Sequence, residues 1–221
     1  VQYMSVIPEQ LQEYALAEIT RRIQTGEYPA GSRLVAKTIA DSLDISSTPV
    51  VAAINRLEMQ GLVETFPRRG AVVKKFSKDD IRNYFQARIM IECFAARLAV
   101  QNIDIMPDVV EEMRDAAENL ANAAANHLVI DEVRTWESQF HSSLVKLSNN
   151  PQLERLYNFN WSVGSVYFVY NIKKIGTDNY LTSLKEHLEI FNVLMERDAD
   201  RLEELVNSHL RFLNTAADWY L

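Results

Sequence analysis

The uneven placement of glycine and proline constrains the fold of this 221-residue chain more than any other feature. Four of the six glycines lie before residue 71, as do Pro29, Pro49 and Pro67, and much longer stretches without either residue follow. Because both residue types form turns and interrupt helices, the first third is expected to be compact and rich in turns. The remainder is expected to form long helices. We therefore predict a mainly α protein with two domains, residues 1–76 and residues 77–221.

The first domain shows the pattern of a winged helix-turn-helix. Apolar spacing and turn residues predict three helices, over residues 9–25, 35–43 and 49–60. Thr48 is expected to be the N-cap of the third helix, because Pro49 suits a first helical turn. Two β-like runs on either side of a Pro-Arg-Arg-Gly turn predict a hairpin, over residues 62–66 and 71–75. In such a unit the third helix enters the major groove of DNA and the hairpin forms the wing.

The second domain is predicted to be an all-helical bundle of about six helices. Capping residues and prolines mark several of the breaks between helices. The expected helices cover residues 78–102, 107–126, 129–148, 151–174, 178–197 and 199–220. Ser77 and Asp80 are expected to open the first of them. The single cysteine, Cys93, falls in this helix and is expected to be a buried thiol.

Charge separates the two domains. The net charge is −7, which alone argues weakly against a nucleic-acid partner. Residues 1–76 carry nine Lys and Arg against eight Asp and Glu, however, whereas residues 77–221 carry 14 against 22. The chain shows no export signal and no apolar run long enough to span a membrane, and its one cysteine excludes an intrachain disulfide. These features predict a cytoplasmic protein with no membrane partner and a local positive surface in its first domain.

Five residues of the first domain are candidates for DNA contact. Ser47 and Thr48 offer hydroxyls and backbone N–H groups near a helix N-terminus, which suits a phosphate. Arg56 lies on the third helix, while Arg68 and Arg69 lie at the hairpin tip, where a wing reaches the minor groove or the backbone. The expected partner is therefore a double-stranded DNA operator.

The same domain resembles the GntR superfamily of bacterial transcription regulators. The matching stretches are residues 26–34, 39–50, 53–63 and 70–73. The resemblance implies a homodimeric regulator, most often a repressor, that responds to an effector. Four residues depart from the family pattern, which usually has an acidic residue at Ala36, arginine at Ser47 and an Arg-Glu pair at Val51 and Ala52.

Histidines in the second domain point to a metal site. Glu137 and His141 are four residues apart on one expected helix, which places both on the same face. His187 and His209 lie about ten residues to either side of the turn between the last two helices, so an antiparallel pair brings them level. The fourth histidine, His127, has no such partner and is expected at the surface.

This arrangement resembles the FCD ligand-binding domain of the FadR subfamily, in its smaller VanR-like branch. That domain binds a divalent metal through an Asp and three His, so the resemblance implies Glu137, His141, His187 and His209 as ligands, with Glu in place of Asp. Zinc is the expected ion, with nickel or manganese as alternatives. The resemblance extends to residues 88–99 of the domain's first helix.

The expected effector is a small molecule, with a carboxylic acid as one candidate. Aromatic residues crowd the helix predicted over 151–174, and Tyr157 and Trp161 are candidates to line its pocket rather than only to pack the core. That helix lacks arginine from 157 to 172, so Arg88 and the metal are the expected partners of an anion. Two alternatives stay open: a metal- or ligand-binding module with weakened DNA recognition, and a metal-dependent hydrolase, although no general base stands at a recognisable spacing.

Overall fold

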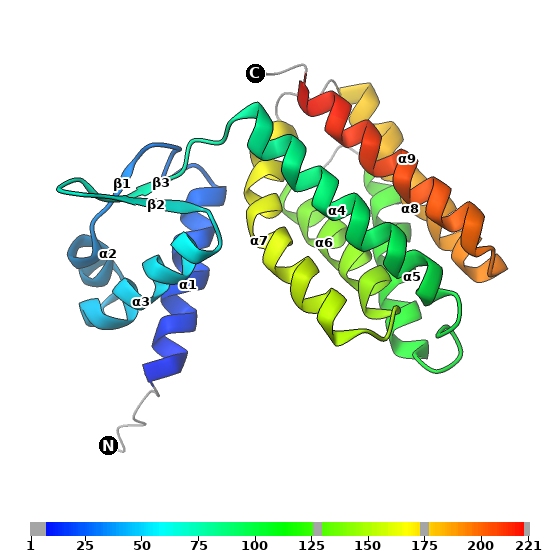
Figure 1. The fold of residues 1–221 in the computed structure, drawn as a ribbon, viewed down its shortest axis with the longest axis horizontal. Helices are drawn as coiled ribbons and strands as arrows, with labels where there is room; N and C mark the ends of the chain where they lie inside the picture. The colour runs from blue at the N-terminus through cyan, green and yellow to red at the C-terminus, as the bar shows by residue number, and fades with distance from the viewer. Residues whose placement is uncertain (1–7, 126–129, 173–176, 219–221) are drawn as a thin grey trace. The chain divides into compact units, whose positions relative to one another are not determined.

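The computed structural model of the chain describes residues 8–125, 130–172 and 177–218, and His127 lies outside them. The chain divides into two compact units, one up to Phe76 and one from Ser77 onward (Figure 1). The fold is mainly α, with one small sheet, as the sequence predicts. Each unit is described by itself.

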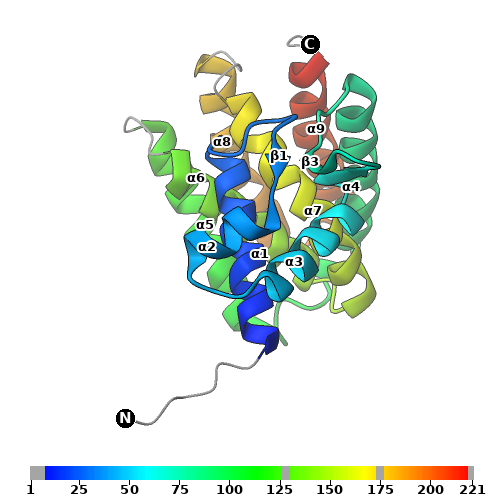
Figure 2. The same ribbon diagram turned by 90° about the vertical axis from the view of Figure 1, so that its left-hand side faces the viewer.

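The N-terminal unit is a winged helix-turn-helix. Its elements are α1 (Pro8–Gln24), β1 (Arg33–Leu34), α2 (Ala36–Leu43), α3 (Ser47–Met59), β2 (Val63–Phe66) and β3 (Gly70–Val73). In Figure 2, α1 lies behind α2 and α3. Side chains of α1 and α3 that are 0% exposed form much of its core, namely Ala15, Ile19, Ile23, Val50, Ala53 and Leu57. The three helices and the hairpin are confirmed.

Two details of this unit differ from the sequence-based expectation. β1 pairs with β3 and completes a sheet of order β1-β3-β2, all antiparallel. Two residues are too few for a recognisable strand pattern, so β1 could not be predicted. The expectation that Thr48 is the N-cap of α3 is wrong: α3 begins at Ser47, and Ser46 is the N-cap, with an extended backbone.

The C-terminal unit contains the six expected helices. They are α4 (Lys78–Ala99), α5 (Pro107–Ala125), α6 (Ile130–Lys146), α7 (Pro151–Ile172), α8 (Thr177–Glu196) and α9 (Ala199–Asp218). Ser77 and Asp80 start α4 as predicted. The Asp80 backbone N–H donates to Ser77 Oγ at 3.1 Å, and the Ser77 backbone N–H donates to Asp80 Oδ2 at 2.8 Å. This reciprocal pair satisfies two N–H groups that the helix leaves open.

The six helices bury a shared core. α4 packs along α9 and also contacts α6 and α7, while α5 lies against α6 and α8 (Figure 1). Met113, Phe140 and Leu194 are among the fully buried core residues. Cys93 is buried, as expected, and burial together with the charge of Glu92 raises the pKa of its thiol to about 12. Within the described ranges, no helix is long and apolar enough to cross a membrane.

Candidate metal centre and nucleic-acid interface

Four polar residues meet inside the C-terminal unit. Glu137 and His141 come from α6, His187 from α8 and His209 from α9, and none is more than 2% exposed. His141 Nε2 lies 3.2 Å from His187 Nε2, and Glu137 Oε2 lies 3.5 Å from each of these two nitrogens. The ring centroids of His187 and His209 are 4.5 Å apart. The structure thus brings together the four residues implied as metal ligands, including the two that lie on either side of the α8–α9 turn.

The outer nitrogen of each histidine faces a hydrogen-bond acceptor. His141 Nδ1 lies 2.6 Å from Glu92 Oε2, and His209 Nδ1 lies 2.8 Å from Glu186 Oε2. His187 Nδ1 lies 3.3 Å from the backbone carbonyl oxygen of Leu184. If each Nδ1 carries the proton and donates it to its acceptor, each Nε2 keeps a lone pair. Metal-binding histidines are commonly held in this tautomer by such outer acceptors.

The electrostatics of the cluster favour a cation. Burial opposes the charge of Glu137, but His187 and His141 hold its pKa well below the usual value. Burial also opposes the charge of Glu92, but Arg88 and His141 lower its pKa to about 2. Burial, helped by the neighbouring imidazole of His187, lowers the pKa of His209 to about 4. At neutral pH the centre therefore offers ionised carboxylates and a neutral imidazole at His209.

The donor set fits a divalent transition metal. Among the described residues, His209 Nε2 and Glu137 Oε2 are buried without a hydrogen-bond partner, which is costly unless another group meets them. The ligand nitrogens of the three histidines all lie within 4.8 Å of one another. Imidazole and carboxylate ligands suit zinc, nickel and manganese. The residues present could therefore hold one such ion.

Sequence reasoning did not single out Glu92 and Glu186 as supports of the metal centre. Glu92 lies four residues after Arg88 and accepts a hydrogen bond from the Arg88 guanidinium while contacting His141. No sequence pattern connects Glu92 to a histidine 49 residues away. Glu186 is next to His187 in sequence but contacts His209 instead.

We expect Glu92→Gln to weaken zinc binding by about 10- to 100-fold, because the amide keeps the shape of the side chain but loses the charge that supports His141. Competition with a zinc-binding dye measures the affinity, and far-UV circular dichroism checks the fold. Glu189→Gln, on the exposed side of α8, is the matched control. Equal zinc affinity in the two variants would show that Glu92 does not support the site.

The three candidate effector residues lie together next to the metal centre. The guanidinium of Arg88 lies 5.1 Å from the ring centroid of Trp161, which stacks on Tyr157 at 6.0 Å. Arg88 is 3% exposed and is paired with Glu92, which reaches His141. Within the described part of the chain, Arg88 Nη2 and the Tyr157 hydroxyl are buried without hydrogen-bond partners. These two groups therefore have hydrogen-bonding capacity that the described protein groups leave unused.

In the N-terminal unit, Ser47 and Thr48 are exposed in the first turn of α3. The N-cap residue Ser46 makes no side-chain hydrogen bond to this turn. The first backbone N–H groups of a helix lack intrahelical partners, so a phosphate can accept from them here.

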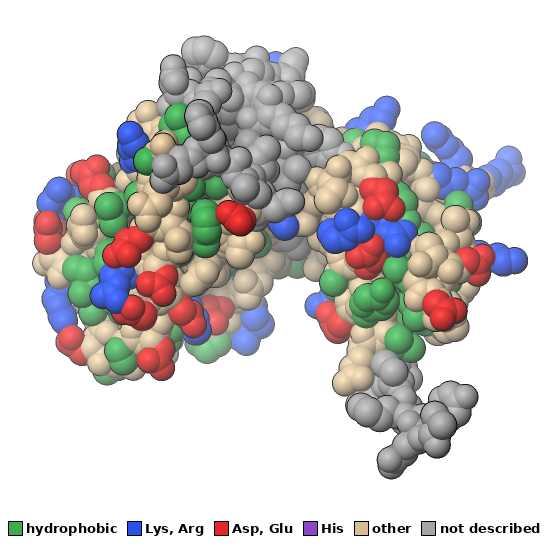
Figure 3. All heavy atoms as spheres, turned by 180° about the vertical axis from the view of Figure 1, so that it is seen from behind, with side chains coloured by type: hydrophobic (Ala, Val, Ile, Leu, Met, Phe, Trp, Pro, Cys, Tyr) green, Lys and Arg blue, Asp and Glu red, His purple; other side chains and the backbone are tan. Residues whose placement is uncertain are grey.

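The three candidate arginines differ in their surroundings. Arg56 forms an ion pair with Glu13 of α1. Arg68 and Arg69 are exposed at the hairpin tip, where the Arg69 backbone N–H donates to the Phe66 carbonyl at 3.2 Å and closes the turn. Figure 3 shows Lys and Arg side chains projecting from the edge of the unit where β2 and β3 meet. Exposure thus leaves the two wing arginines open to a phosphate, whereas Arg56 is engaged by a carboxylate.

A winged helix-turn-helix joined to a helical unit with a buried polar centre defines a class of protein, the ligand-responsive transcription regulators. Comparison with known families identifies the particular group. Residues 11–73 match the bacterial regulatory proteins of the gntR family, and residues 83–212 match the FCD domain. The chain belongs to the GntR-family regulators that carry an FCD domain.

Related proteins agree with this assignment. The HTH-type transcriptional repressor RspR of Escherichia coli K12 is 25% identical over 201 residues, which cover 86% of this chain and 85% of RspR. The Nta operon transcriptional regulator of Aminobacter aminovorans is 26% identical, with 82% of each chain covered. The solved structure of E. coli McbR/YncC has the same fold, with a TM-score of 0.80, 19% identity, and 96% of this chain and 99% of that one covered.

These matches settle the class of activity. The chain is a DNA-binding transcription regulator with an effector-binding FCD domain. The expectation that it is not an enzyme is confirmed, because both families and the relatives are regulators of transcription. The hydrolase alternative is therefore wrong.

Proposed function

We propose that this regulator represses transcription as a homodimer and that an effector bound at a divalent metal in its FCD domain controls operator binding. The observation that carries the proposal is the buried centre at which His141, His187, His209 and Glu137 converge with unpartnered ligand atoms. Repression is supported by RspR, a relative that is named a repressor. Zinc is the proposed ion, with nickel and manganese as alternatives.

Charge supports an anionic effector such as a carboxylic acid. The charges of Arg88 and Glu92 cancel, and Glu137 offsets one of the two charges of a divalent ion, so the centre keeps one positive charge. A buried anion requires such a counter-charge. The open positions of the metal and the free Arg88 Nη2 are proposed to receive the carboxylate, with Tyr157 and Trp161 beside it.

The test uses a fluorescent duplex from the region upstream of the gene and the zinc-loaded protein. We expect a panel of carboxylic acids to contain one that releases the DNA, while the corresponding amide does not. The same acid should have no effect on protein whose metal has been removed with a chelator. An effector that acts equally with and without metal would contradict metal-dependent control, and a reporter gene would establish the sign of regulation.

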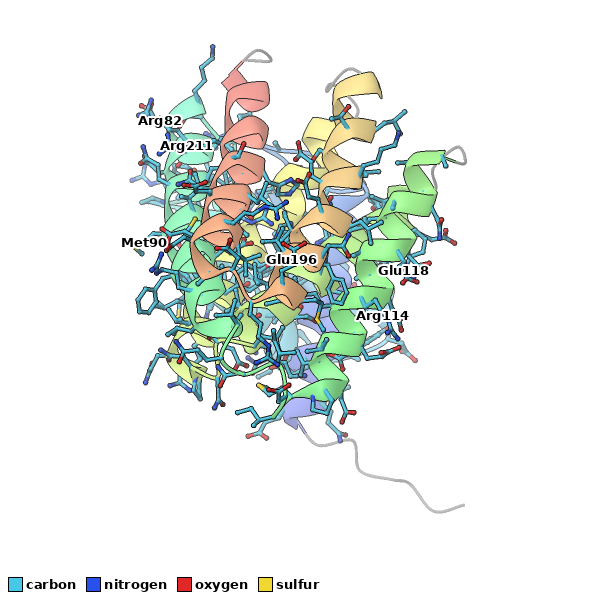
Figure 4. All side chains as sticks on the ribbon, turned by 90° about the vertical axis from the view of Figure 1, so that its right-hand side faces the viewer. Arg82, Met90, Arg114, Glu118, Glu196 and Arg211 are labelled. Carbon is cyan, nitrogen blue, oxygen red and sulfur yellow. The ribbon has the colours of Figure 1, made fainter. Side chains whose placement is uncertain are left out.

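Homodimerisation is proposed through the C-terminal unit. Met90 and Phe94 of α4 are four residues apart, 66% and 54% exposed, and share one helix face. Figure 4 shows Met90 pointing outward from α4. Light scattering should give a dimer at micromolar concentration, and Met90→Glu combined with Phe94→Glu should shift it toward monomer. Met195→Glu, an exposed position on α8, is the control. A wild-type monomer at this concentration would contradict the proposal.

In the DNA-binding unit, Ser47, Thr48, Arg68 and Arg69 are proposed to contact the sugar-phosphate backbone and the minor groove. Arg56 is also a candidate, but it must leave Glu13, or share its guanidinium with that carboxylate, to reach a phosphate. Its contribution to affinity is therefore expected to be smaller than that of the wing arginines.

A further inference from the structure

The outward face of α3 has an unusual composition for a helix that reads DNA. Ser47, Val51 and Asn55 follow one another at intervals of four residues, so they form one line along the helix. Ser47 and Asn55 are exposed, and Val51 is 45% exposed although it is aliphatic. The opposite face of the helix is buried in the core and consists of Pro49, Val50, Ala53, Ile54 and Leu57. An apolar side chain thus stands at the centre of the exposed face.

Charged residues of α3 are directed away from this line or are already engaged. Arg56 is the only Lys or Arg of the helix, lies about 140° around it from Val51 and pairs with Glu13 of α1. Glu58 accepts a hydrogen bond at 3.1 Å from the Thr65 backbone N–H of β2. The centre of the outward face therefore presents a methyl-bearing and an amide side chain, with no cation.

We infer that α3 reads A·T base pairs, with Val51 against the methyl group of a thymine and Asn55 on an adenine. In the major groove the thymine methyl accepts apolar contacts, and an asparagine amide matches adenine N6 and N7 in a bidentate pair. Guanine is most often read by arginine or lysine, which this face lacks. One helical turn separates the two side chains by about 6 Å, so their base pairs lie within about two steps of each other. The inference rests on DNA binding by the winged helix and specifies what that helix recognises.

The first experiment selects binding sites for the full-length protein from a random duplex library. We expect each half-site to contain A·T pairs at two positions no more than about two steps apart. In a synthetic site, replacing the contacted thymine by uracil removes only its methyl group and should weaken binding about fourfold. The Val51→Ala variant should bind the thymine and uracil duplexes almost equally, because it lacks the contacting methyl groups.

Two further variants test the reading residues directly. Asn55→Ala should reduce the preference for adenine at the base pair that Asn55 contacts by about 5- to 150-fold. Val51→Arg should shift the selected base toward guanine, since arginine pairs with guanine O6 and N7. Arg68→Ala is the matched control, because loss of a wing contact should weaken binding to all sequences and leave these base preferences unchanged.

Several outcomes would overturn the inference. One is that the wild-type protein selects a G·C pair at a position where the Val51→Ala or Asn55→Ala variant shows no base preference. Another is equal binding of the thymine and uracil duplexes by the wild-type protein. Binding without any enriched sequence would overturn it and favour a module with weakened DNA recognition. Absence of binding to any duplex would contradict the DNA-binding function itself, and the inference with it.

Discussion

His187→Ala is expected to remove bound zinc and with it a large part of the thermal stability of the C-terminal unit. The wild-type ligands come from α6, α8 and α9, so an ion held by all of them opposes separation of these helices. Free zinc at about 1,000 times its Kd stabilises a folded protein by about 4 kcal/mol. For a unit of this size, that corresponds to a rise in Tm of roughly 10 °C.

Differential scanning calorimetry with and without zinc measures this shift, and elemental analysis of protein purified without chelator measures the metal content. In the His187→Ala variant both the zinc content and the zinc-dependent shift should be lost. His127→Ala removes a histidine that is not one of the four proposed ligands, so it should keep both. A wild-type protein with no bound metal and no shift with zinc, nickel or manganese would leave these residues as a polar pocket only.

The fold was largely predictable from the sequence because breakers and hydrophobic periodicity act locally. Pro107 and Pro151 begin α5 and α7 as expected, and the hairpin lies around Pro67. The exceptions arise where a short local signal competes with tertiary pairing. β1 exists because Arg33 and Leu34 pair with β3, which lies more than 35 residues later in the sequence. The start of α3 differs by two residues because Ser46 and Thr48 are similar in their capacity as N-caps.

Of the candidate site, the sequence predicted only the four expected metal ligands and not the carboxylates that contact them. Helical spacing alone places Glu137 with His141, and the equal arms of the α8–α9 pair place His187 with His209. The outer carboxylates were not found, because the contact between Glu92 and His141 depends on how α4 packs against α6. The residue pattern along one helix does not determine which residues of another helix it contacts. The exposure of Val51 likewise depends on the packing of α3 against α1 and α2.

Replacing both wing arginines, Arg68→Ala with Arg69→Ala, is expected to lower the affinity for DNA of any sequence by roughly 100-fold. The two side chains are exposed at the hairpin tip, and contacts with phosphates carry no sequence information. The slope of log affinity against log salt concentration should become less steep by about two for each half-site. Fluorescence anisotropy at several salt concentrations measures both effects.

A control with the same loss of charge is Arg114→Ala with Arg201→Ala, since both arginines are exposed on the C-terminal unit. It should change the affinity and the salt slope much less. If the wing variant binds the upstream DNA as tightly as the wild type, the assignment of the hairpin to DNA contact is wrong.

The backbone conformation of Arg68 at the hairpin tip allows one variant to change DNA affinity and stability in opposite directions. Arg68 has a φ of 66°, in the left-handed region that costs a non-glycine residue about 1 kcal/mol. Arg68→Gly should therefore raise the free energy of unfolding of the N-terminal unit by up to about 1 kcal/mol, because glycine adopts this conformation without strain. The same variant should bind DNA more weakly. A variant that is more stable but binds DNA more weakly would show that the Arg68 side chain serves DNA binding and not the stability of the turn. Urea unfolding measures the stability of this variant, and fluorescence anisotropy measures its affinity for DNA.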